Sequence, residues 1–332
     1  IEDVFARLPA HTQTFLLQTS ILSRLCGPLC DAVIGVSGVG GRAAAPALPA
    51  GTMPEESYSR LILDALERDN LFLVPLDGER QWYRYHPLFA DVLRERLRAG
   101  TRREQLLTLY RRASAWLWRS CLPAEAIACA LDAPDYALAA EQIEAVSRQM
   151  LGRGESVTLI EWMRALPAAL LRARPALALA YAWALFHPNQ WAPIEPHLAH
   201  AEAALLAAEP VPGASSGPLA AEIVALRGCI AGHRGESLRA IEWGELALRE
   251  LPADDLRVRC AVLVSLGTAN YMQGRVKEAV QASLDAIAIG SRGRYLFQAI
   301  HAHYYTMAGL FVTGDLGAIA AHCHQACRFA AE

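Results

Sequence analysis

The sequence predicts a mainly α-helical protein in which a small unit with one β-hairpin precedes a long stack of paired helices. Three observations lead to this prediction. The only β signal lies at residues 71–85, the chain from Thr101 onward shows helical apolar periodicity alone, and a phrase of small residues recurs with glycines at 235, 274 and 314. We therefore divide the chain into a first domain at 1–100, a helical-repeat region at 101–210 and longer repeats at 219–332.

The first domain contains short helices around one hairpin. Residues 2–8, 12–19, 29–34 and 58–68 have helical patterns, whereas 35–57 is rich in Gly, Ala and Pro and is predicted as a loop. Apolar residues 71–74 and aromatic residues 82–85 flank Asp77-Gly78, a dipeptide that favours a tight hairpin turn. A further helix is predicted over 86–98. Helices followed by a hairpin and another helix are the order of elements in a winged-helix domain.

The last part repeats a phrase typical of tetratricopeptide repeats. In such repeats, small residues allow the two helices of a pair to approach, and a glycine closes the turn between them. The glycine spacings of 39 and 40 exceed the usual repeat of about 34 residues, so we predict longer helices in a tetratricopeptide-like α-superhelix. A generic stack of α-hairpins is the alternative. The two clear copies contain Gly228, Gly235, Ala240, Ala247 and Pro252, and Gly267, Gly274, Ala279 and Ala286; a weaker copy has Gly314 and Ala326, and an earlier one Asn189 and Ala201.

Composition excludes several classes of protein. With 31 Lys+Arg against 34 Asp+Glu, the net charge is −3, which gives no overall electrostatic basis for nucleic-acid binding. Lys277 is the only lysine and is followed by Glu278, so the chain lacks the Gly-Lys-Ser/Thr of a Walker A phosphate loop. No apolar run is long enough to span a membrane, and the 8 scattered cysteines are typical of reduced thiols. We therefore expect a cytoplasmic protein without membrane contact.

His86 is the candidate phosphate-binding residue. It stands where the hairpin passes into a helix, and a helix N-terminus attracts anions. The alternative is a histidine that caps the helix or packs against Phe89. No Ser-His-Asp, Cys-His or paired-carboxylate arrangement has the spacing of a known catalytic family, so we predict that the chain itself is not an enzyme and holds no cofactor of its own.

A cluster of histidines and cysteines near the end of the chain has the residue types of a metal site. It comprises His322, Cys323, His324 and Cys327, with His301 and His303 available from the preceding helix. Cys323 and Cys327 lie four apart and share one helical face, whereas the two histidines beside them project in other directions. We therefore predict no metal site.

Aromatic residues are frequent in the repeats, and the concave surface of a superhelix commonly binds peptides, proteins or small ligands. The alternative is that these side chains fill gaps between helices. We select five of them as the candidate surface for a ligand or partner: Tyr181, Trp183, Trp243, Tyr271 and Tyr304.

Several segments resemble one family of regulators. FLLQTSILSRLCGPLCDAV at 15–33 resembles the segment that follows the ATPase core in MalT-type LuxR-family transcriptional regulators. NLFLVPLD at 70–77 and WYRYHPLFADVL at 82–93 are similar to the winged-helix end of the same family. WMRALP at 162–167 and RPAL at 174–177 resemble the helical-repeat region of the same family. The resemblance spans nearly the whole chain.

This resemblance implies a regulator in three parts: an ATP-binding module, a sensor superhelix and a C-terminal helix-turn-helix that binds DNA. This chain would hold the middle, so ATP and ADP are expected only for the full-length protein. A small-molecule inducer or a regulatory protein would bind the superhelix, and the activated protein would self-associate. In related ATPases a histidine in a Met-His-Asp phrase contacts the β-phosphate of ADP; His86 occupies a similar place, with Pro87 where the acid would be. The alternative is a tetratricopeptide scaffold for protein–protein interaction without a transcriptional role.

Overall fold

The computed structural model describes residues 2–36, 57–186, 193–207 and 217–331 of the chain. These residues form two compact units, 1–142 and 143–332. The helix α8 (Tyr136–Arg153) contains the boundary between them. None of the helices in the described ranges is long and apolar enough to cross a membrane.

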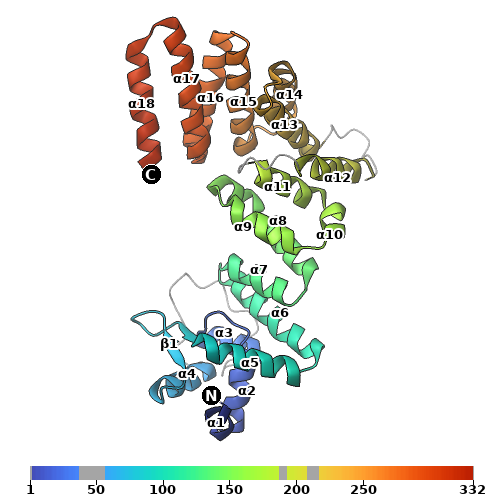
Figure 1. Ribbon diagram of the computed structural model, residues 1–332, viewed down its shortest axis with the longest axis vertical. Coiled ribbons are helices and arrows are strands. Elements are labelled where there is room, and N and C mark those ends of the chain that lie inside the picture. Colours follow the sequence, from blue (N-terminus) through green and yellow to red (C-terminus); the bar gives the residue numbers. More distant parts are fainter. Residues whose placement is uncertain (1, 37–56, 187–192, 208–216, 332) are drawn as a thin grey trace. The chain divides into compact units, whose positions relative to one another are not determined.

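The first unit has the predicted order of elements (Figure 1). Helices at the start of the chain are followed by a two-stranded antiparallel hairpin and three further helices before α8. The elements are α1 (Glu2–Arg7), α2 (Ala10–Thr19), α3 (Gly27–Ile34), α4 (Tyr58–Arg68), β1 (Leu73–Pro75), β2 (Tyr83–Tyr85), α5 (Pro87–Gly100), α6 (Arg103–Arg119) and α7 (Pro123–Asp132).

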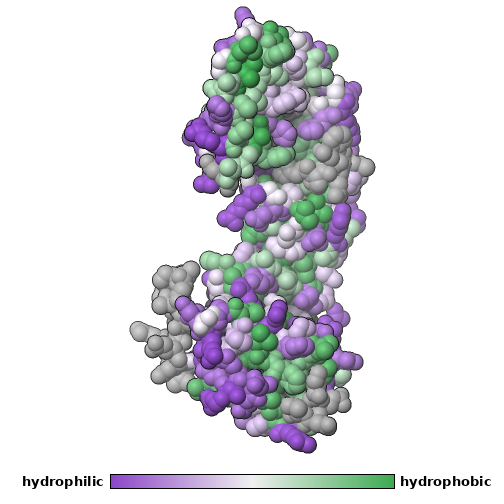
Figure 2. Space-filling model, turned by 60° about the vertical axis from the view of Figure 1, so that its left-hand side comes forward, coloured by the Kyte–Doolittle hydropathy of each residue, from purple (hydrophilic) through white to green (hydrophobic). Residues whose placement is uncertain are grey.

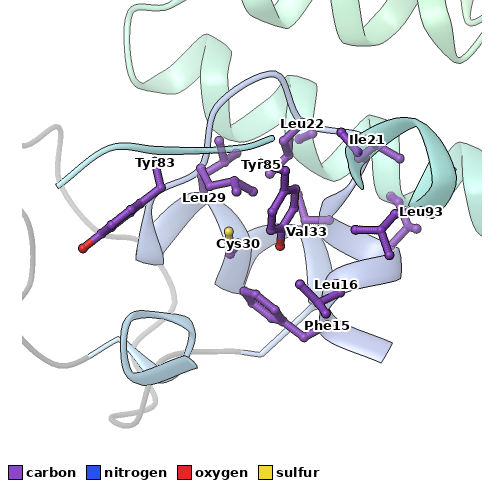
Figure 3. Packing of buried hydrophobic residues seen from close by; sticks show 14 of the residues in the cluster. Phe15, Leu16, Ile21, Leu22, Leu29, Cys30, Val33, Tyr83, Tyr85 and Leu93 are labelled. Carbon is purple, nitrogen blue, oxygen red and sulfur yellow. The ribbon is translucent and has the colours of Figure 1, made fainter. Parts of the chain in front are cut away.

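The core of this unit lies where the hairpin meets α2, α3 and α5. Tyr85 points from β2 into the cluster beside Cys30, with Phe15 and Leu16 below it (Figure 3). Its buried hydroxyl lies 2.8 Å from the Thr19 hydroxyl, which in turn donates to the carbonyl of Phe15. Burial raises the pKa of Tyr85 well above its ordinary value, so this phenol stays protonated. The aromatic face of the hairpin thus supplies the core around which the helices pack.

The predicted tight turn at Asp77-Gly78 is wrong. The last hydrogen bond of the hairpin joins the Leu76 amide to the carbonyl of Trp82 at 2.8 Å, which leaves residues 77–81 in the loop. The Asp77 carboxylate accepts from the amides of Gln81 and Trp82 at 2.8 and 3.0 Å. Aspartate therefore acts here through its side chain, as a cap for a longer loop, and the glycine after it is not needed for a positive φ.

The described residues of the second unit form helices and their connections, with the helices arranged mostly as antiparallel pairs (Figure 1). Each helix from α13 onward contacts the next, and α13, α15 and α17 also contact one another in sequence, as the first helices of stacked repeats do. Besides the end of α8, the elements are α9 (Ser156–Ala165), α10 (Ala168–Ala173), α11 (Pro175–Phe186), α12 (Ile194–Ala207), α13 (Pro218–His233), α14 (Ser237–Glu250), α15 (Leu256–Met272), α16 (Val276–Gly293), α17 (Leu296–Thr313) and α18 (Leu316–Ala331).

The repeat phrase has the predicted structural roles. Gly235, Gly274 and Gly314 close the turns within the three pairs with φ of 78°, 70° and 81°, a region that favours glycine. A Cβ atom added at Gly267 would lie 2.4 Å from the Ser283 hydroxyl, so glycine is what lets α15 approach α16. The helices of 14 to 18 residues in these pairs explain the long period. The turn predicted at Asn189 and most of the loop predicted at 35–57 lie outside the described residues.

Asp31 ties α3 to the start of α4. Its buried carboxylate accepts from the Ser57 hydroxyl at 2.5 Å and from the Ser59 amide at 2.9 Å. Ser57 is itself the N-cap of α4 and accepts from the Arg60 amide. One carboxylate therefore satisfies two donors at a helix N-terminus, where an anion is also favoured by the helix dipole.

We predict that Asp31→Ala lowers the free energy of unfolding of the first unit by about 2–3 kcal/mol, because buried hydrogen bonds to a charged group are lost. Amide hydrogen exchange of residues in α3 and α4 measures the change. Asp69→Ala is the matched control, since Asp69 is an exposed residue at the other end of α4. Equal exchange in both variants would contradict the prediction.

Candidate functional site

A cavity of about 310 Å³ lies between α12, α13 and α14 in the second unit. It combines charged residues with one large aromatic side chain, Trp243, which belongs to the predicted ligand surface. We call it the Trp243 pocket. Its lining consists of Glu195, Arg227, Ile230, Ala231, Arg234, Glu236, Arg239 and Trp243.

Helical spacing brings these residues to one place. The lining residues of α13 and its C-cap recur every three or four positions and so share one face of the helix. Gly235 then reverses the chain, and α14 returns with Arg239 and Trp243. A Cβ atom at Gly228 would lie 3.3 Å from both the Gly244 amide nitrogen and the Trp243 Cβ. The small residue that defines the repeat thus sets how closely Trp243 approaches α13.

The carboxylates of the pocket are engaged by arginines. Arg227 donates to Glu202 at 3.1 and 3.2 Å and to Glu195 at 3.0 Å, which joins α13 to α12. Burial opposes the charge of Arg227, but these hydrogen bonds raise its pKa overall. Arg239 pairs with Glu236 at 2.9 Å. The exposed Arg234 guanidinium forms no hydrogen bond or ion pair within the described part of the chain.

The other four predicted surface residues do not join this pocket. Trp183 is fully buried and Tyr181 nearly so, in the core around α11. The Tyr181 ring lies tilted against that of His197, with ring centroids 4.5 Å apart. Tyr271 is half-buried, and Tyr304 is 60% exposed on α17. Both lie against Tyr305, at centroid distances of 6.3 and 5.1 Å. The five residues therefore belong to three separate places.

The surface near Tyr304 is apolar. The turn between α17 and α18 exposes Phe311, Val312 and Leu316, and Figure 2 shows hydrophobic surface gathered at this end of the second unit. α18 has no buried residue.

Sequence reasoning missed a buried charge network in the same unit. Glu222 of α13 accepts from Arg257 of α15 at 2.5 Å, with both side chains 6% exposed. The Arg257 guanidinium also lies 4.8 Å from the ring centroid of Trp183. Arg148 of α8 reaches Glu222 at 3.5 Å and Asp255, the N-cap of α15, at 3.0 Å. Glu222 stands inside the otherwise apolar start of α13, and this position could have indicated a buried ion pair from the sequence alone.

His86 lies at the surface of the first unit, as the N-cap of α5. Its backbone amide donates to the carbonyl of Phe72 at 2.7 Å, and its carbonyl accepts from the Phe89 and Ala90 amides. Its imidazole makes no capping hydrogen bond, and Phe89 packs instead on Phe72 and Tyr85. The backbone fixes the residue while the side chain remains available to a partner.

The order of elements in the first unit agrees with a family comparison. The family described as the MalT winged helix domain matches residues 1–106. Residues 1–106 are a MalT-type winged-helix domain. His86 lies within the matched residues, between β2 and α5.

Curated relatives match more of the chain. The serine/threonine-protein kinase PknK from Mycobacterium tuberculosis is 33% identical over 227 residues, which are 68% of this chain and 18% of the kinase. PknK from Mycobacterium bovis gives the same values. The chain thus spans less than a fifth of the length of these relatives.

A solved structure shows the same fold beyond the MalT-type domain. It is a signal transduction ATPase with numerous domains (STAND) with a tetratricopeptide repeat sensor, from Pyrococcus horikoshii. The TM-score is 0.58 at 12% identity, over 99% of this chain and 45% of that protein. The predicted fold class, a winged-helix unit followed by a tetratricopeptide-like stack, is therefore confirmed.

Two histidines of the predicted histidine and cysteine cluster meet in the last helical hairpin, and one of them is buried. His303 of α17 is fully buried, and its Nδ1 lies 3.0 Å from Nδ1 of His322 on α18. Cys323 and Cys327 are exposed, and no group of three metal-ligand side chains occurs among the described residues. Burial, with a smaller contribution from His322, lowers the pKa of His303 to about 4.

We predict an acid-sensitive hairpin. Because the folded pKa of His303 lies below its ordinary value of 6.5, its contribution to stability is present above pH 6.5 and is lost as the pH falls through about 4. The loss amounts to about 3 kcal/mol. Hydrogen exchange of α17 and α18 between pH 7 and pH 4 measures it, corrected for intrinsic exchange rates.

His303→Gln should remove this pH dependence, whereas His324→Gln, at an exposed position of α18, should keep it. Retention of the full acid effect in His303→Gln would show that another group titrates.

Proposed function

We propose that this chain is the regulatory sensor segment of an ATP-dependent transcriptional regulator. The observation that carries the proposal is a MalT-type winged-helix domain in the same chain as a tetratricopeptide-like stack that contains a charged pocket. The STAND protein of similar fold has a tetratricopeptide repeat sensor by its own description. In this proposal the ATPase module and the DNA-binding domain lie outside the chain, which itself performs no catalysis.

The regulation we propose is a shift between two nucleotide states. A ligand or regulatory protein on the repeats favours an ATP-bound, self-associating form over an ADP-bound monomer. Only a difference in affinity for the two states produces such a shift. Converting a population from 1:99 to 99:1 requires about 10⁴-fold tighter binding to the favoured state. The reading frame tests the arrangement: a Gly-Lys-Ser/Thr loop upstream and a helix-turn-helix downstream are expected.

A second function is favoured by the exposed apolar surface at the α17–α18 turn. A stack with Phe311 and Leu316 at the surface suits a tetratricopeptide scaffold that binds another protein. A reading frame without the phosphate loop and without the helix-turn-helix would favour this alternative.

We propose that His86 contacts the phosphate of ADP held by the upstream module. Its exposed imidazole at the N-terminus of a 14-residue helix suits an anion. In the full-length protein, His86→Ala should weaken ADP binding about 10- to 100-fold, the effect of losing one hydrogen bond to a charged group. Isothermal titration calorimetry measures it.

His11→Ala is the matched control, since His11 is also exposed in the first unit and lies on a different helix. Neither substitution should change the melting temperature, because neither removes a buried side chain. Unchanged ADP affinity in His86→Ala would remove this residue from the nucleotide site.

A further inference from the structure

We propose that the Trp243 pocket binds a small molecule that carries one anionic group, a carboxylate or a phosphate, beside a flat apolar part. The inference rests on the proposed sensor function and names the chemistry of its ligand. Three features of the pocket lead to it: an arginine without a partner among the described residues, a helix N-terminus without a side-chain cap and an apolar wall.

The first feature is the charge balance. Three arginines and two glutamates line the cavity, and both glutamates already accept from arginines, Glu195 from Arg227 and Glu236 from Arg239. A cationic ligand would have to break one of these pairs. An anion meets the Arg234 guanidinium, which has no partner in the described residues, and leaves both pairs intact.

The second feature is the start of α14. This helix of 14 residues begins at Ser237, directly after Glu236, and no side chain caps its first turn. Because Glu236 and Arg239 both line the cavity, the first turn of α14 borders it. The amides of a helix N-terminus carry a partial positive charge, which adds to that of Arg234.

The third feature is the apolar wall. Trp243, Ile230 and Ala231 supply apolar surface to the cavity. An indole face is large and flat, and it packs well on a planar or aliphatic group. The volume of about 310 Å³ lies at the lower end of the range for small-molecule sites, so the ligand is small.

Phenyl phosphate is a suitable probe because it has both chemical parts. Titration calorimetry on the chain should show phenyl phosphate binding at least tenfold more tightly than inorganic phosphate, phenol or benzylamine. Arg234→Ala should weaken phenyl phosphate binding about tenfold or more, and Trp243→Leu should reduce its advantage over inorganic phosphate. Arg249→Ala is the matched control, as an exposed arginine at the other end of α14.

Circular dichroism establishes that each variant is folded. Failure of phenyl phosphate to bind at millimolar concentration, equal binding by Arg234→Ala and Arg249→Ala, or tighter binding of benzylamine would overturn the inference. So would binding of hexaglutamate without binding of phenyl phosphate, because that result would indicate an acidic protein partner.

A separate measurement distinguishes this inference from the proposed function. In one outcome phenyl phosphate binds as expected, but neither its binding nor deletion of 143–332 changes ATP turnover or ADP release in the full-length protein. That result would support the proposed ligand chemistry and contradict the sensor function. If the deletion changes nucleotide turnover but phenyl phosphate does not bind, the result would support the sensor function and contradict the proposed ligand chemistry.

Discussion

The second unit depends on one buried ion pair between Arg257 and Glu222. The two side chains are almost fully buried in a region where α11, α13 and α15 meet, and Trp183 covers the guanidinium. Burial raises the pKa of Glu222, and the guanidinium opposes that rise. Removing either partner would leave an uncompensated buried charge, a far larger cost than the net gain of forming the pair. The pair therefore penalises any register of the stacked helices that would separate the two charges.

Small residues and this ion pair impose complementary constraints. The glycines and alanines of the repeat phrase set how closely two helices of one pair approach, as Gly267 does for α15 and α16. They do not determine which pair follows or in what register. Charges between pairs supply that information: Arg227 joins α13 to α12, and Arg148 reaches α13 and the start of α15. A chain with 30 arginines and one lysine suits this role, because a guanidinium can satisfy two carboxylates at once.

The local sequence pattern predicted helices, strands and turn glycines well. It failed where contacts between residues distant in the sequence determine the structure. The turn glycines have positive φ, and the hairpin and its flanking helices lie where periodicity placed them. The Asp77-Gly78 loop differed because the Asp77 carboxylate accepts from backbone amides four and five residues further on, which a dipeptide preference does not describe. Trp183 and Trp243 were both selected by residue type, yet one is core and the other lines a pocket. That difference depends on which helices pack beside each tryptophan. The ion pairs of the pocket likewise join Arg227 of α13 to Glu195 and Glu202 of α12, residues far apart in the sequence.

α13 carries both the pocket and the buried pair, which limits how ligand binding can act on the stack. Arg227 and Arg234 face the cavity, whereas Glu222, five residues before Arg227, lies about 140° away around the helix and faces Arg257. A helix held by a buried ion pair cannot slide by a fraction of a turn without separating the charges. Any ligand that displaces α13 must therefore move α15 with it or break the pair. Since breaking it costs several kcal/mol, concerted movement of whole helices is the lower-energy response, as in other switches built from packed helices.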